Sequence, residues 1–149
     1  MSESQLPVVH MRPYRWGDPT HEAALPELAR QALTALGVQP SAAPVPPEHA
    51  RLPDRQLTAD ALAALTDALG ADHVLTDHDS RLAHTRGWST PDLLKLRSGD
   101  ASDAPDAVVL PGSSEQIVRV LEICSEHRIA VVPFAGGTSV VGGLVAARD

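Results

Sequence analysis

The sequence predicts an α+β protein in which a helical N-terminal extension precedes a βαβ unit. Three observations carry this prediction. Apolar residues recur with the 3.6-residue period of helices over much of residues 21–97. Two short β-type runs, at 107–110 and 129–134, then flank a helix with a clear N-cap. A glycine-rich segment follows the second run directly, and we expect a right-handed parallel crossover between the two runs.

The composition excludes several classes of protein. The 149 residues carry 12 Lys+Arg and 19 Asp+Glu, and the net charge of −7 argues against a general nucleic-acid binder. The single cysteine excludes an intramolecular disulfide and a zinc site built from several thiolates. No apolar run approaches the ~20 residues of a membrane span, and the N-terminus lacks the pattern of a signal peptide. We therefore expect a cytoplasmic protein without a transmembrane segment.

Residues 1–54 are interpreted as an arm, a helix and a proline-rich linker. The arm at 1–20 is expected to pack against the protein, and docking onto a partner is the alternative. A helix over 21–36 is expected to use its apolar stripe for packing and to end at Gly37. The prolines of 38–54 should leave no regular element. The arm contains Arg12, Tyr14, Arg15 and Trp16, and the stripe contains Leu25, Leu28, Ala32, Leu33 and Leu36.

Residues 55–104 are expected to form a helical segment. A helix over 59–69 should begin after Thr58 as N-cap and end at Gly70, with Leu62, Leu65 and Leu69 as its apolar face. Two shorter helices are expected around 79–84 and 91–96. The spacing of His73, His78 and His84 does not favour a metal site, and we predict none. The acidic residues are interpreted as caps and solvated loop groups, namely Asp77, Asp79, Asp100, Asp103 and Asp106.

Residues 105–149 contain the predicted βαβ unit. Its helix should begin after Ser113, because Gln116 follows at the spacing of a capping box. The helix should end near 127–128, where basic residues suit a helix C-terminus. Cys124 lies on its apolar stripe and is interpreted as a buried structural thiol. The full stripe is predicted to be Ile117, Val120, Leu121 and Cys124.

The segment 133–143, PFAGGTSVVGG, is the strongest functional signal in the sequence. Glycines allow positive φ and a close approach of ligand to backbone, and consecutive N–H groups can then bind an anion. We interpret the segment as a phosphate or pyrophosphate loop, with a flexible turn or a bulge as the alternative. A Walker loop is excluded because no lysine follows Lys95. The glycine spacing also does not match a Rossmann loop.

These motifs resemble the FAD-binding vanillyl-alcohol oxidase / p-cresol methylhydroxylase (PCMH-type) flavoproteins. The resemblance covers roughly residues 75–149 and rests on KLR at 95–97, PDAVVLP at 105–111 and IAVVPFAGGTSVVGG at 129–143. The segment RLAH at 81–84, with Gly87 and Asp92, is also similar. Within the superfamily, the motif order is most similar to alkylglycerone-phosphate synthases. The fold implied is a helical extension followed by the first βαβ unit of a PCMH-type FAD-binding domain.

The resemblance implies that backbone amides of the glycine loop contact the FAD pyrophosphate. Some members of the family attach FAD covalently through a histidine near the glycine loop. No histidine lies between Arg128 and Asp149 in this sequence, so the resemblance implies that FAD is bound non-covalently. Ala135 stands where relatives often have glycine, and an alanine is unstrained there only at negative φ. The implied cofactor contacts are Pro133, Phe134, Ala135, Gly136, Gly137, Thr138, Ser139, Val140, Gly142 and Gly143.

The same resemblance leaves the reaction open. The catalytic residues are expected beyond Asp149, so the chain is interpreted as an N-terminal fragment that is inactive alone. An alkylglycerone-phosphate synthase exchanges a fatty acid for an alcohol on a dihydroxyacetone-phosphate unit. A 2-hydroxy-acid (glycolate or lactate) dehydrogenase or oxidase is the alternative enzyme, and an inactive interaction module is the alternative outside catalysis. A lipid-derived or small-molecule substrate and a homodimer are the expected partners.

Overall fold

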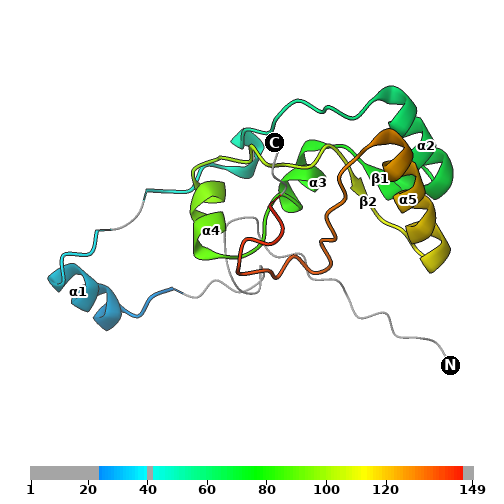
Figure 1. The fold of residues 1–149 in the computed structure, drawn as a ribbon. Coiled ribbons are helices and arrows are strands. Elements are labelled where there is room, and N and C mark those ends of the chain that lie inside the picture. Colours follow the sequence, from blue (N-terminus) through cyan, green and yellow to red (C-terminus); the bar gives the residue numbers. More distant parts are fainter. Residues whose placement is uncertain (1–23, 40–41, 146–149) are drawn as a thin grey trace.

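The computed structural model describes residues 24–39 and 42–145. The aromatic and basic cluster predicted in residues 1–20 lies outside this part of the chain. Within the described ranges, no helix is long and apolar enough to cross a membrane. The elements, in chain order, are α1 (Glu27–Ala35), a 3-10 turn (Pro47–His49), α2 (Ala59–Leu69), a second 3-10 turn (Ala71–His73), β1 (Val74–Leu75), α3 (His78–Ala83), α4 (Thr90–Arg97), β2 (Val108–Val109) and α5 (Ser114–His127) (Figure 1).

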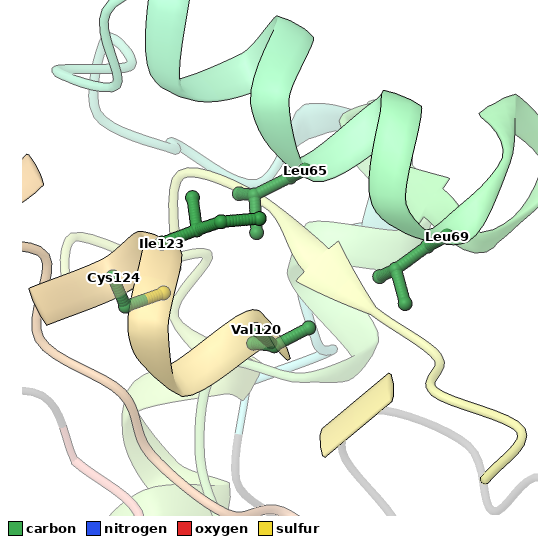
Figure 2. Packing of buried hydrophobic residues seen from close by; sticks show 5 residues of the cluster. All are labelled: Leu65, Leu69, Val120, Ile123 and Cys124. Atoms are coloured by element: carbon green, nitrogen blue, oxygen red, sulfur yellow. The ribbon is translucent and has the colours of Figure 1, made fainter. Parts of the chain in front are cut away.

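Helices α2 and α5 pack against each other and form the main hydrophobic core (Figure 2). The bounds of α2 agree with the prediction: Thr58 Oγ1 accepts a hydrogen bond from the N–H of Ala61, and Gly70 ends the helix at φ 90°. Leu65 of α2 and Ile123 of α5 are 3% and 1% exposed. The buried members of the cluster are Leu65, Leu69, Val120, Ile123 and Cys124.

The apolar face predicted for α5 is partly wrong. Ser113 caps the helix as predicted, and Gln116 accepts a hydrogen bond from the N–H of Gly112 rather than from Ser113. However, Ile117 and Leu121 are 48% and 50% exposed, whereas Ile123 is buried. The side chains that face α2 are three and four residues apart, which is the spacing of one helical face. Periodicity alone does not show which apolar face meets α2.

The α+β class is confirmed, but the predicted parallel pairing is absent from the described residues. The sheet has two strands, and β2 pairs antiparallel with β1, Val74 opposite Val109. Residues 129–134 form no strand. A strand needs a neighbouring backbone to pair with its N–H and C=O groups, and these residues meet none in the described part of the chain. The glycine loop therefore follows an irregular segment rather than a strand.

Two predictions about the N-terminal extension also need correction. Helix α1 ends at Ala35, and Gly37 follows its C-cap Leu36 at φ 75°, but none of the helix residues is buried, and Leu28 is 80% exposed. Figure 1 shows α1 apart from the remaining helices, so it is not a packing helix here. The proline-rich linker is not wholly irregular, because it contains the 3-10 turn Pro47–His49 and a parallel bridge between Arg51 and Asp100. Isolated turns and bridges need few backbone donors, which proline-rich sequence can still supply.

Candidate functional site

The glycine loop begins with a tight turn over Phe134 to Gly137. The N–H of Gly137 donates to the carbonyl oxygen of Phe134 at 2.9 Å. Ala135 has φ 49°, and Gly136 is not among the residues with positive φ. Positive φ at the first central position alone is the pattern of a type II′ turn, which favours glycine at that position. Ala135 thus adopts the left-handed conformation, at a cost of roughly 1–2 kcal/mol for an L-residue.

The ring of Phe134 closes over Gly137. Gly137 is buried at φ 66°, and a Cβ atom there would lie 2.5 Å from ring atoms of Phe134. Both the backbone conformation and the close ring contact require glycine at this position. The turn is therefore specified by Gly137 and the ring of Phe134.

The second half of the loop is closed by Ser139. Its Oγ accepts a hydrogen bond from the N–H of Gly143 at 3.3 Å. Gly142 has φ 74°, and a Cβ atom there would meet nothing within 4 Å. The nearest atom to a Cβ on Gly136 would be Thr138 Cγ2, at 3.7 Å. The backbone at Gly136 and Gly142 is therefore open to a close approach by a ligand.

Several N–H groups of the loop are available to a ligand. Within the described ranges, the N–H groups of Gly136, Thr138, Ser139 and Val140 donate to no acceptor. Hydrogen-bond donors grouped in a glycine-rich loop form an anion-binding concavity, and phosphate oxygens are strong acceptors. These residues therefore fit a pyrophosphate without a lysine or arginine in the loop.

The loop contacts a segment about fifty residues earlier in the chain, at residues 84–89 between α3 and α4. The N–H of Trp88 donates to the carbonyl oxygen of Ser139 at 2.6 Å. The rings of His84 and Phe134 have centroids 4.6 Å apart at 52°. Figure 1 shows the chain after α5 running back to the region of α3 and α4.

Two buried arginines hold the 84–89 segment in place. The guanidinium of Arg86 is fully buried, donates to the backbone oxygen of Asp100 at 2.7 Å, and forms an ion pair with the Asp103 carboxylate. Arg81 donates to the backbone oxygens of Pro53 and Pro105, each at 2.7 Å. Buried guanidinium groups with several acceptors fix the backbone around them.

The remaining candidate residues are distributed as follows. Cys124 is confirmed as buried, and desolvation raises the pKa of its thiol. Asp77 caps α3, and the hydrogen bond from the N–H of Ser80 lowers the pKa of its carboxyl. Among the described residues, no three His, Cys, Asp or Glu side chains lie together as potential metal ligands. Lys95 lies exposed in the last turn of α4. Asp92 is buried, and its Oδ2 has no hydrogen-bond partner in the described part of the chain.

Sequence reasoning missed the roles of Arg86 and Asp103. It interpreted Asp103 as a solvated loop acid, whereas its carboxylate pairs with a guanidinium that solvent does not reach. The two residues are 17 positions apart. No helical or strand spacing connects them, so only the fold brings them together.

Comparison with known proteins agrees with this geometry. Residues 105–149 match the model of the FAD binding domain family. The alkyldihydroxyacetonephosphate synthase of Trypanosoma brucei brucei is 36% identical over 94 residues, which are 63% of this chain and 15% of that protein. The glycolate oxidase subunit GlcD of Bacillus subtilis is 51% identical over 39 residues, which are 26% of this chain and 8% of that protein.

The structure is also similar to a solved structure of an alkyldihydroxyacetonephosphate synthase. The TM-score is 0.80 at 20% identity, over 93% of this chain and 32% of that one. The chain thus spans at most about a third of the length of these relatives. FAD is the cofactor that the matched domain binds. Residues 105–149 thus match the FAD binding domain family, and the chain has the fold of a part of alkyldihydroxyacetonephosphate synthase.

Proposed function

We propose that residues 133–143 hold the pyrophosphate of FAD. The observation that carries this proposal is the set of N–H groups without acceptors at Gly136, Thr138, Ser139 and Val140. Each would donate to a phosphate oxygen, and the hydroxyl of Thr138 adds a further donor. The open space at Gly136 and Gly142 admits the ligand to the backbone. When bound, FAD supplies the redox or group-transfer chemistry of its isoalloxazine ring.

We further propose that the whole protein is an FAD-dependent enzyme of the alkyldihydroxyacetonephosphate synthase kind. In that reaction an alkyl alcohol replaces the fatty acid of an acyl-dihydroxyacetone phosphate. The similarity to the Trypanosoma brucei brucei synthase and the structural likeness support this proposal. The chain of 149 residues alone is proposed to be inactive, because it spans 15% of the Trypanosoma brucei brucei synthase and 32% of the solved one.

Oxidation of a 2-hydroxy acid is the second candidate reaction. The observation that favours it is the 51% identity to the glycolate oxidase subunit GlcD over 39 residues. Turnover of the longer protein with acyl-dihydroxyacetone phosphate plus an alcohol, or with glycolate and D-lactate, separates the two candidates directly.

FAD binding is tested by titrating the chain with FAD and following flavin fluorescence and co-elution in gel filtration. ADP, which carries the pyrophosphate, should compete, whereas riboflavin should not. Gly137→Ala should weaken binding at least about tenfold, because its Cβ displaces the Phe134 ring. Gly112→Ala is the matched control, since its Cβ would meet only Gln116 Oε1 at 3.4 Å. Absence of any FAD binding, or equal binding by both variants, contradicts the proposal.

A further inference from the structure

We propose that the 84–89 segment is a positioning element for the glycine loop, in which Gly87 and Trp88 fix the orientation of the loop's amides before a cofactor binds. This inference rests on the proposed function, since it concerns the same loop. The segment lies outside residues 105–149, which match the FAD binding domain. If the proposal holds, residues of the helical segment before residue 105 contribute to the cofactor site.

Gly87 packs closely against the backbone of the glycine loop. Gly87 is buried, and a Cβ atom on it would overlap the backbone carbonyl of Ser139. Its φ is not in the left-handed region, so the backbone conformation does not demand glycine. The requirement comes from the distance between the two backbones alone.

The peptide bond between Ser139 and Val140 is held in one orientation by Trp88. The Ser139 carbonyl oxygen accepts the N–H of Trp88 at 2.6 Å and therefore points toward the 84–89 segment. In a planar trans peptide the C=O and the following N–H point in opposite directions. The N–H of Val140 must then point away from this segment and cannot flip without breaking the bond to Trp88. The direction of this proposed donor is thus set by a residue outside the loop.

The loop is also held at its start, in addition to the contact at Ser139. His84 packs on Phe134 at the start of the loop. Its Nδ1 lies 2.7 Å from the carbonyl oxygen of Ser80, which can only accept, so Nδ1 carries the proton and the ring orientation is fixed. The buried Arg86 holds the segment itself. A loop ordered in advance loses less conformational entropy when a ligand binds, and its affinity is higher for that reason.

The test compares Gly87→Ala with Gly112→Ala as the matched control. Hydrogen exchange of the two hydrogen-bonded amides of the loop, Gly137 and Gly143, is measured in the cofactor-free chain, together with the Kd for FAD and for ADP and the melting temperature. Gly87→Ala should speed exchange in the loop at least about tenfold and raise both Kd values at least about tenfold. Exchange in α2 and α5 and the melting temperature should stay unchanged. Gly112→Ala should match the wild-type chain in every measurement.

The outcomes separate this inference from the proposed function. If the wild-type chain binds FAD and Gly87→Ala binds it equally well with unchanged loop exchange, the positioning role is wrong. If the wild-type chain binds no FAD, the proposed function fails, and the exchange comparison alone decides the positioning role. If Gly87→Ala unfolds, His84→Leu decides: faster exchange of the Gly137 amide with α2 and α5 still protected supports positioning, and unchanged exchange of that amide overturns it.

Discussion

The α2–α5 core and the 84–89 segment are stabilised in opposite ways. The core is apolar and holds two helices by side chains such as Leu65 and Ile123. The 84–89 segment contains no helix or strand and is held by buried guanidinium groups that bind carboxylate and backbone oxygens. The hydrophobic effect is non-directional, whereas hydrogen bonds to a buried charge require defined donor and acceptor positions. The part of the molecule that contacts the glycine loop is thus the part with directional interactions.

Truncating the core should have the largest effect. Ile123→Ala should lower the free energy of unfolding by about 2–5 kcal/mol, because it leaves a cavity where the side chain is 1% exposed. Urea denaturation measures the change. Ile117→Ala on the same helix is the control and should change stability by at most about 0.5 kcal/mol, since Ile117 is 48% exposed. Equal losses would show that α5 packs on a different face.

Weakening the buried ion pair should have the next largest effect. Asp103→Asn leaves the buried guanidinium of Arg86 with a neutral partner and should cost about 1–3 kcal/mol in urea denaturation. The loss should change little with added salt, because solvent does not reach the guanidinium. Asp79→Asn is the control: Asp79 is 90% exposed beside His78 and should contribute under about 0.5 kcal/mol. A salt-dependent loss at Asp103 would contradict the burial of Arg86.

Replacing Ala135 by glycine should stabilise the protein, because glycine adopts positive φ without strain. Ala135→Gly removes the strain of φ 49° and should raise the free energy of unfolding by about 0.5–1 kcal/mol after the entropy of glycine is subtracted. Ala130→Gly is the control, because Ala130 has no positive φ and glycine there should destabilise by about 0.4–1 kcal/mol. If both substitutions changed the free energy of unfolding in the same direction, the type II′ turn at Ala135 would be contradicted.

The smallest effect is expected at the cap of α3. The N–H of Ser80 lowers the pKa of Asp77 below its ordinary value of 3.8. A lowered folded-state pKa adds stability above pH 3.8 that is lost as pH falls through the lower value. Asp77→Asn should therefore cost about 0.3–1 kcal/mol near neutral pH and nothing at pH values below the folded-state pKa. If the stability difference between Asp77→Asn and the wild-type chain grew as the pH fell, the pKa of Asp77 would not be lowered in the folded state.

The same contrast explains what the sequence could predict. The bounds of α2 follow from Thr58 and Gly70, which are local caps, and short-range rules are enough to place them. The buried face of α5 was only half predicted, because Ile117 and Ile123 have the same chemistry and the position of α2 decides between them. The glycine loop was recognised from its residues. Its conformation at Ala135 depends on φ, which composition does not fix.

Non-local polar contacts were beyond the reach of sequence reasoning. The Arg86–Asp103 pair and the contact of Gly87 with Ser139 join residues without any regular spacing. The pairing of β2 with β1 rather than with residues 129–134 is of the same kind. Each of these three contacts forms only because the intervening chain folds so that the two residues or strands meet. The cofactor residues 133–143 remain a prediction that only a ligand can test.

The most direct test of the central claim is amide NMR of the chain during titration with FAD. The amides of Gly136, Thr138, Ser139 and Val140 should shift downfield and slow their exchange, because they gain phosphate acceptors. The amides of Leu65 and Ile123 in the distant core should not change. ADP should reproduce the shifts of the loop. Shifts confined to other residues, or none at saturating FAD, would contradict the assignment of this loop as the pyrophosphate site.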